Sequence, residues 1–385
     1  MKDRDSDFSD FNDFGGFEIK TIGFIGFGLI GGSIAKAIKA SRPDVIICAY
    51  DYHSNPPSED LAQAMSDGIL NRVTTDLSEG FPECDIIFLC APVMANISYL
   101  GKLKGLVKPS CIITDVGSVK GSIHDAAAEL DMEDVFIGGH PMTGSEKTGY
   151  RHSYALLLEN AYYILTPTGK TPPAKLDALL GLVNEMGSLP IILDPGEHDE
   201  ITAAISHLPH IIAAQLVNLI RDSENMGDKM KQLAAGGFKD ITRIASSSPK
   251  MWQNICLTNS GTIKAILDKY IIYLKNVSDA LEAMDADYLY SMFDTAGEYR
   301  NSIPNRPVGL IQRVFEIFVD IIDEAGAIAT IAALLAGNGI SIKNIGIIHN
   351  REFQEGVLRI EFYDEKSLNE AKELLRKSHY HVYDR

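Results

Sequence analysis

The sequence predicts an α/β protein with three structured parts: an α/β domain, an all-helical domain and a small α+β domain. Short buried strand-like runs alternate with helical stretches up to about Asp194, a pattern typical of a parallel sheet with helical crossovers. From about residue 196 to residue 301 the pattern is almost wholly helical. The residues from about Val314 onward follow the order βαββαβ, which is the ferredoxin-like split unit.

Composition supports this division and excludes several classes of partner. The 385 residues suffice for two or three domains, and 45% hydrophobic with 23% charged residues is a globular composition. A formal charge of −17 argues against binding to nucleic acid or anionic lipid. An anionic small-molecule ligand would therefore need local cationic groups. The strongest candidate for a membrane span, residues 318–337, contains three acidic residues, so we expect none.

The N-terminal residues and the cysteines indicate the cellular compartment in which the protein is expected to reside. Residues 1–17 are acidic, carry phenylalanine at no regular period and predict a disordered tail without a secretory signal. The five cysteines are odd in number and form no CxxC pair. Three of them lie in apolar runs, where a free thiol packs as a small hydrophobic side chain. We expect a reduced, soluble, cytoplasmic protein.

The individual elements follow from apolar runs and their periods. Strands of the α/β domain are predicted within residues 21–28, 45–51, 85–92, 111–118, 135–140, 161–167 and 189–194. The long helical stretches with apolar stripes are residues 201–222 and 261–284. After a proline-containing linker, the last part is expected to hold strands within 314–322, 340–350, 355–363 and 380–384, with helices over 325–339 and 367–378.

A glycine-rich turn follows the first strand and opens a helix. It has the GxGxxG pattern, formed by Gly26, Phe27, Gly28, Leu29, Ile30 and Gly31. Within a βαβ unit this pattern indicates a Rossmann-type dinucleotide-binding domain, in which Gly26 makes the turn, Gly28 admits a pyrophosphate and Gly31 allows close packing. Asp51 ends the second strand, where a carboxylate accepts hydrogen bonds from a ribose 2′-OH and repels a 2′-phosphate. The cofactor is therefore predicted to be NAD rather than NADP.

His140 is the candidate general base. It follows a predicted strand, at the sheet edge where open α/β sheets bind ligands. A neutral imidazole there could accept a hydroxyl proton as hydride departs to a nicotinamide. A histidine that is merely hydrogen-bonded within its loop has about equal weight on position alone. Ser118 ends an earlier strand in the same way and could bond cofactor, substrate or His140; a Ser–His–Asp nucleophilic triad is rejected because the G-x-S-x-G elbow is missing.

Three further histidines, His198, His207 and His210, lie within or just before the first long helical stretch. His207 and His210 share a helix face, but neither an HExxH motif nor a cysteine cluster accompanies them, so we expect no metal. Pro209 should bend the helix and free a carbonyl. That bend could turn His210 inward, whereas His207 could be purely structural.

Arg243 supplies a cation that an anionic ligand would require, because its guanidinium offers two parallel donors to a carboxylate. A surface salt bridge would be the preferred interpretation in the absence of the other motifs. Trp252 is the one tryptophan in the chain and follows soon after. Core packing is its default role, and the wall of an active site is the alternative.

These motifs together resemble the prephenate and arogenate dehydrogenases of tyrosine biosynthesis. The matching segments are GFGLIGGS, DVGSVK, GGHPMTGSEKTGY, ISHLPH and FKDITRIASSSPKMW, in this order across residues 20–300. The resemblance implies NAD-dependent oxidative decarboxylation of prephenate, with His140 accepting or holding the ring hydroxyl proton and Ser118 bridging nicotinamide, hydroxyl and His140. It also implies that Arg243 anchors a substrate carboxylate and His210 helps to bind the side chain. Glu146 and His198 become supporting or gating positions, and the helical domain forms a homodimer.

The C-terminal part resembles an ACT domain, a module that commonly binds amino acids. The resemblance places an effector, expected to be tyrosine acting by feedback inhibition, at Glu324, Ala325, Gly326, Ala327, Ile328 and Asn338. Ala325 stands where many family members carry proline. An ACT domain used for oligomerisation alone is the alternative.

The resemblance divides the chain into residues 1–17, 18–194, 195–303 and 314–385. These are an acidic tail, an NAD-binding domain, a helical substrate and dimerisation domain, and a regulatory domain. Three other functions remain open at this stage. They are an arogenate dehydrogenase, which differs in accepting an amino rather than a keto side chain, a non-catalytic sensor of NAD and an amino acid, and a β-hydroxyacid dehydrogenase. The last would be expected to use a lysine of the helical domain as its acid or base.

Overall fold

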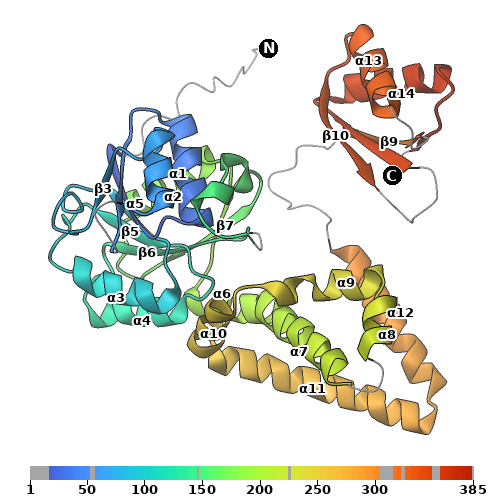
Figure 1. The fold of residues 1–385 in the computed structure, drawn as a ribbon, viewed down its shortest axis with the longest axis horizontal. Coiled ribbons are helices and arrows are strands. Elements are labelled where there is room, and N and C mark those ends of the chain that lie inside the picture. The colour runs from blue at the N-terminus through green and yellow to red at the C-terminus, as the bar shows by residue number, and fades with distance from the viewer. Residues whose placement is uncertain are drawn as a thin grey trace, which may run out of the picture. The chain divides into compact units, whose positions relative to one another are not determined.

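The computed structural model describes residues 17–52, 57–144, 147–223, 227–303, 315–321, 326–348 and 356–383. Contacts within the chain divide it into two compact units, Met1–Pro307 and Val308–Arg385. The first unit contains the α/β domain and the helical domain, and the second is a small α+β domain (Figure 1).

The α/β domain is built on an eight-stranded sheet with the order β3-β2-β1-β4-β5-β6-β7-β8. Its strands are β1 Thr21–Ile25, β2 Ile46–Tyr50, β3 Arg72–Thr74, β4 Ile86–Leu89, β5 Ile112–Asp115, β6 Phe136–Pro141, β7 Tyr162–Pro167 and β8 Leu189–Ile192. The strand order reverses between β1 and β4, which run parallel. The carboxyl ends of these two strands therefore form the crevice where sheets of this kind bind ligands.

Helices cover both faces of this sheet because alternate strand residues point to opposite sides. The helices are α1 Leu29–Ser41, α2 Glu59–Ser66, α3 Val93–Leu103, α4 Gly121–Glu129 and α5 Pro173–Glu185. Phe24 and Phe88, from β1 and β4, stack with ring centroids 5.1 Å apart in the core beneath α1 and α5. Their neighbours Ile25 and Leu89 enter the second core, with residues of α3 and α4. Truncating either phenylalanine to alanine should cost about 3–5 kcal/mol of stability.

Two features of the sheet differ from the sequence prediction. The sheet is not wholly parallel, since β7 runs antiparallel to β6. No crossover helix joins this pair; the described residues between them form two short 3₁₀ turns, so the chain returns along the neighbouring strand in the opposite direction. The short strand β3 was not predicted, because its three residues are too few to show an apolar run.

The helical domain contains α6 Pro195–Thr202, α7 Leu208–Asp222, α8 Gly227–Leu233, α9 Gly236–Thr242, α10 Pro249–Thr258, α11 Ser260–Ala283 and α12 Ala286–Ser302. The bend predicted before Pro209 is a π-helical turn, Ala203–His207, that joins α6 to α7. Proline lacks the N–H that would continue the α-helical ladder, and π turns of this kind occur at functional sites. Asp194 caps α6 by accepting hydrogen bonds from the main-chain N–H groups of Gly196 and Glu197.

The C-terminal unit confirms the predicted βαββαβ order. Its elements are β9 Phe315–Ile321, α13 Ala327–Gly337, β10 Ile342–Ile348, β11 Gly356–Phe362, α14 Glu365–Lys377 and β12 Val382–Tyr383. The strands form an antiparallel sheet with the order β10-β11-β9-β12. Residues such as Ile331 and Leu375 of the two helices pack on Val319 and Ile360 of the sheet in a separate core.

The predicted N-terminal tail was assigned one residue too many. Residues 1–16 lie outside the described part of the chain, but Phe17 is partly buried and packs against the core of the α/β domain. Burial of this aromatic ring fixes the segment that leads into β1.

Candidate functional site

The glycine turn has the geometry that a dinucleotide site requires. Gly26 adopts φ +90°, and a Cβ there would lie 2.7 Å from the main-chain carbon of Cys90. A Cβ on Gly31 would lie 2.7 Å from the carbonyl oxygen of Gly26. Gly28, the N-cap residue of α1, has no described atom within 4 Å of such a Cβ and no side-chain cap. Open space therefore lies at the positive end of α1, where a phosphate would meet main-chain N–H groups.

The apolar residues of the motif serve packing. The Phe27 ring stacks on Tyr150 with centroids 5.5 Å apart, Leu29 is buried, and Ile30 packs against the same core. Packing of α1 against the sheet accounts for these side chains, so the predicted contacts of these residues with a nucleotide would come from their main chain.

Asp51 lies directly after β2, at the same edge of the sheet. It is buried, and its Oδ2 accepts a hydrogen bond from the Ser58 main-chain N–H at 3.0 Å. Its own N–H donates to the Thr74 carbonyl at 2.9 Å, which fixes its position next to the strand end. The carboxylate is thus placed where a ribose hydroxyl of a nucleotide on the glycine turn would lie.

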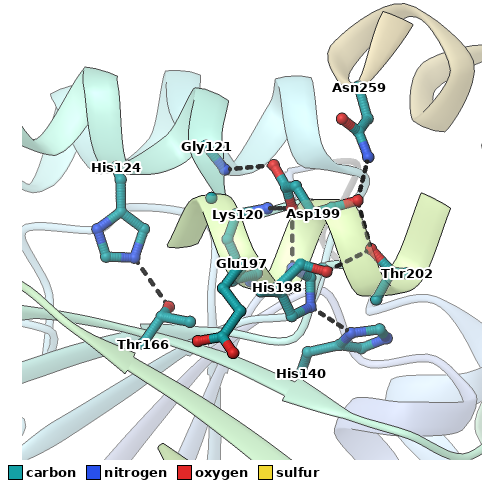
Figure 2. A network of polar contacts seen from close by, with 12 residues as sticks. Lys120, Gly121, His124, His140, Thr166, Glu197, His198, Asp199, Thr202 and Asn259 are labelled. Atoms are coloured by element: carbon teal, nitrogen blue, oxygen red, sulfur yellow. Dashed lines mark hydrogen bonds and ion pairs between the residues drawn. The ribbon is translucent and has the colours of Figure 1, made fainter. Parts of the chain in front are cut away.

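His140 is connected to a buried relay of polar groups (Figure 2). Its Nδ1 lies 2.8 Å from Nε2 of His198, and Nδ1 of His198 lies 2.8 Å from Oδ1 of Asp199. Asp199 also accepts hydrogen bonds from the main-chain N–H groups of Lys120 at 2.7 Å and Gly121 at 2.8 Å. These bonds join the α/β domain to α6, because His198 and Asp199 belong to that helix.

The relay fixes which nitrogens carry protons. Hydrogen bonds from His198 and from two main-chain N–H groups lower the pKa of Asp199, although burial opposes them, so this group is a carboxylate. It accepts the Nδ1 proton of His198, whose bare Nε2 must then accept the Nδ1 proton of His140. Burial, with the nearby positive charges, lowers the pKa of both imidazoles and keeps them neutral. Nε2 of His140 is consequently an unprotonated acceptor, as a general base requires.

A buried ion pair holds the strand ends around this histidine. Lys120 and Asp115 are both wholly buried and in direct contact. Lys120 Nζ also donates to the Gly139 carbonyl at 2.7 Å, and Asp115 accepts from the N–H groups of Gly117 at 2.9 Å and Gly139 at 3.1 Å. The pair therefore ties the loop carrying Ser118 to the residue before His140. Sequence reasoning missed it, although Asp115 and Lys120 flank Ser118 in the DVGSVK segment.

A second group of ring side chains lies in the helical domain. The His210 ring stacks on Trp252 with centroids 3.8 Å apart, and His210 Nδ1 bonds the Ser206 carbonyl at 2.9 Å. Arg243 begins the 3₁₀ turn Arg243–Ser246, which packs against α7, the helix that carries His210. After the larger effect of burial, the charge of Arg243 contributes to lowering the pKa of His210. Trp252 also packs on Val93 and Val119 of the α/β domain.

Not every predicted site residue lies where the sequence suggested, and some lie outside the described part of the chain. His198 lies behind His140 rather than on an open surface, so its contact is with the imidazole. Glu146, Glu324 and Ala325 lie outside the described residues. Gly326 caps α13 with φ +100°, Ala327 and Ile328 begin that helix, and the Asn338 amide bonds the Leu334 carbonyl at 2.9 Å. Among the described residues no group of three or more histidine, cysteine or acidic side chains could hold a metal ion.

Glycine turn, histidine relay and helical partner domain together define a dinucleotide-dependent dehydrogenase. The particular family follows from comparison with known proteins. Residues 34–191 match the family model of the prephenate dehydrogenase nucleotide-binding domain, and residues 194–295 match that of the prephenate dehydrogenase dimerization domain. The chain belongs to the prephenate dehydrogenase family.

Individual relatives agree with this assignment. The prephenate dehydrogenase of Bacillus subtilis is 39% identical over 357 residues, which are 92% of this chain and 95% of that protein. The cyclohexadienyl dehydrogenase of Zymomonas mobilis is 34% identical over 73% of this chain and 95% of its own length. The solved prephenate dehydrogenase of A. aeolicus, in complex with hydroxyphenyl propionate and NAD+, has a TM-score of 0.70 at 29% identity and covers 75% of this chain and 100% of its own.

The relatives differ in how much of the chain they match. The first unit is 307 of the 385 residues. A match over 92% of the chain must extend into the C-terminal unit, whereas one over 73% can be confined to the first unit. The relative from B. subtilis therefore has a counterpart of at least part of this unit.

Proposed function

We propose that this protein catalyses the NAD-dependent oxidative decarboxylation of prephenate to 4-hydroxyphenylpyruvate. The observation that carries the proposal is the relay from Asp199 through His198 to His140, which leaves an unprotonated nitrogen at the mouth of a nucleotide-binding sheet. A protein that only sensed NAD and an amino acid would have no use for a proton acceptor there. Family membership supports the same activity.

The chemistry assigned to the chain is proton transfer and orientation. Nε2 of His140 accepts the proton of the ring hydroxyl, and the relay orients the imidazole as it becomes charged. NAD+, when bound, accepts the hydride from the carbon that bears this hydroxyl. Cleavage of the bond to the ring carboxylate releases CO2, and the bonding pair completes the aromatic ring. His140 then returns its proton to the phenolic oxygen, so no proton is gained or lost overall.

The glycine turn and Asp51 provide a fitting site for NAD. Main-chain N–H groups at the start of α1 bind the pyrophosphate in the open space beside Gly28. Asp51 accepts hydrogen bonds from the ribose hydroxyls and repels a 2′-phosphate. Ser118 lies on the loop between β5 and α4, and it bridges the nicotinamide, the substrate hydroxyl and His140.

Arg243 and His210 bind the carboxylated side chain of the substrate. With a net charge of −17, the protein needs a local cation to attract a dianion, and the guanidinium near the His210–Trp252 stack supplies it. Glu146 is assigned a gating role on the family resemblance alone. An arogenate dehydrogenase is the second candidate, because a solved arogenate dehydrogenase from Synechocystis has a TM-score of 0.64 at 28% identity.

The functional unit is a homodimer formed through the helical domain. That domain exposes large apolar side chains on several helices, including Leu219, Ile271, Ile272, Leu281 and Phe293. The stretch Pro195–Asp222 even has the length and hydropathy of a membrane span, but it carries the buried polar residues His198 and Asp199 of the relay. A contact between two subunits would cover these exposed apolar side chains. The five free cysteines support a location in the cytoplasm.

The C-terminal unit acts as an ACT domain that binds tyrosine and inhibits the enzyme. Its βαββαβ topology supports the assignment, and the N-terminus of α13, capped by Gly326, offers main-chain N–H groups to an amino-acid carboxylate. An alternative role in oligomerisation alone predicts no response to tyrosine.

The test is NADH formation with prephenate and with arogenate, each with and without tyrosine. Prephenate is expected to be the better substrate, and tyrosine is expected to reduce the rate. The His140→Asn variant should lose roughly 10²–10⁴-fold in turnover while NAD+ binding is unchanged. Undiminished turnover of this variant would remove His140 from the mechanism.

A further inference from the structure

His207, at the end of the π-helical turn, has a defined tautomer. Its Nδ1 lies 3.4 Å from Nδ2 of Asn259, which also donates to the Asp199 carbonyl at 3.0 Å. A carbonyl oxygen can only accept, so this atom of Asn259 is the amide nitrogen, which can only donate. Nδ1 of His207 is therefore the acceptor, and the ring proton is on Nε2.

This Nε2–H is a buried donor that lacks a well-formed hydrogen bond. His207 is wholly buried, and among the described residues no atom has full hydrogen-bond geometry with Nε2. The main chain of Ser118 approaches the ring as a weak acceptor, which partly opposes the lowering of the His207 pKa by burial. Burial lowers the pKa of His207 to about 4, so the ring is neutral at physiological pH. An unsatisfied buried donor destabilises a protein by roughly 1–3 kcal/mol, which indicates that a purely structural role does not explain this histidine.

The donor lies among the residues of the site. Its ring makes an edge contact with Trp252 at a centroid distance of 6.0 Å, and Asn259, which approaches its Nδ1, also donates to the main-chain carbonyl of the relay residue Asp199. Trp252 Nε1 is a second buried donor without a partner among the described residues. Two buried N–H groups without well-formed hydrogen bonds, on rings that contact each other edge to face, point to a ligand that carries acceptor oxygens.

We propose that Nε2–H of His207 binds an acceptor oxygen of the ligands bound beside His140, either the carboxamide oxygen of the nicotinamide or a carboxylate oxygen of the substrate. This inference rests on the proposed function. Because the ring is neutral, the bond positions a ligand without adding charge next to His140. His207 is thus a binding residue, in addition to the relay through His198.

Three substitutions separate this role from packing. Asparagine places its amide near the position of Nδ1, glutamine places its amide near Nε2, and phenylalanine fills the space without a donor. For His207→Phe and His207→Asn we expect at least a tenfold rise in the Kd for NAD+, measured by calorimetry, or in the KM for prephenate. His207→Gln should restore the affected constant to within about threefold, and the constant that changes identifies whether cofactor or substrate supplies the oxygen.

The matched control is His124→Phe. His124 also has a pKa lowered to about 4, but its Nε2 is already bonded to Thr166 Oγ1 at 2.8 Å. This variant should leave both constants unchanged. Wild-type constants in His207→Phe and His207→Asn would overturn the inference, as would a glutamine variant impaired as strongly as the asparagine variant. If wild-type protein formed no NADH from either substrate, the proposed function would fail, and an unchanged NAD+ Kd in the variants would then overturn the inference separately.

Discussion

At the scale of single residues, the protonation states of the site depend on one carboxylate. The Asp199 carboxylate accepts three hydrogen bonds, two from main-chain N–H groups and one from Nδ1–H of His198. It therefore acts only as an acceptor at the start of the relay. Each step along the relay then has one possible donor and one possible acceptor. In the proposed mechanism, hydrogen-bond complementarity prepares His140 as the general base, with no charged imidazole in the resting site.

Asp199→Asn tests this dependence. The asparagine amide can donate to Nδ1 of His198, which moves the protons along the relay and leaves Nε2 of His140 protonated. We expect kcat to fall roughly 10²–10⁴-fold with an unchanged Kd for NAD+. The control is Thr202→Val, which removes a nearby hydroxyl bonded to the His198 carbonyl at 2.9 Å. It should lower the melting temperature and leave kcat within threefold. A kcat within threefold of wild type in Asp199→Asn would contradict the relay.

Arg243→Ala tests the anion site. Loss of the guanidinium should raise the KM for prephenate about tenfold or more, equivalent to about 1.4–2 kcal/mol, while kcat changes less. Lys239 is an exposed cation on the preceding helix, and Lys239→Ala removes the same charge from the protein. Steady-state kinetics of both variants should distinguish a direct contact between Arg243 and the substrate from an effect of the overall charge of the protein. Equal KM changes in the two variants would indicate that only net charge matters.

Several candidate site residues stood out in the sequence at this scale. The glycines, Asp51 and His140 follow predicted strands, whereas His207 and His210 stood out as a pair on one helix face. The relay could not be predicted, because His140 and His198 are 58 residues apart and their bond depends on how α6 packs against the sheet. Lys120 was missed for a similar reason: its partner Gly139 is brought close only by the pairing of β5 with β6.

At the scale of elements, we expect the end of β2 to determine the choice between NAD and NADP. Asp51→Ala should lower the ratio of kcat/KM for NAD+ to that for NADP+ at least about tenfold, because the alanine neither bonds the ribose nor repels a 2′-phosphate. Asp51→Asn keeps an acceptor oxygen and removes the charge, so it separates the two effects. An unaltered ratio in both variants would show that another group reads the ribose.

Local patterns predicted elements better than their directions. The apolar runs located seven of the eight strands in the large sheet, since buried strands need continuous hydrophobic residues. They did not reveal that β7 runs antiparallel to β6. The direction of a strand depends on the segment that connects it to its neighbour rather than on the residues of the strand itself. Pro209 did predict a distortion, which the structure contains as the π turn that ends at His207.

At the scale of the whole molecule, buried neutral histidines make stability depend on pH. His124 and His207 titrate near 4 in the folded state and near 6.5 when unfolded. Above pH 6.5 both states are neutral and stability is unaffected. As the pH falls below 6.5, the unfolded chain binds protons that the folded chain does not, so each histidine lowers the free energy of unfolding by up to about 1.4 kcal/mol per pH unit.

The melting temperature should therefore decline between pH 7 and pH 5, and less steeply in His124→Phe, which removes one of these histidines. Calorimetry of both proteins across this range measures the difference in slope. Parallel pH profiles would contradict the predicted depression of the His124 pKa.

The second unit offers a prediction about regulation. Its core contains only residues of the unit itself, and relatives such as the Zymomonas protein match 73% of this chain over 95% of their own length. A chain ending at Pro307 should therefore fold and retain prephenate turnover within a few fold, whereas tyrosine should no longer inhibit it. Initial rates against tyrosine concentration, measured for the full chain and the shortened chain, test the two statements separately. Equal tyrosine inhibition in both would place the effector in the first unit, as a competitor for the substrate site, and would leave the ACT-type unit with a role in assembly.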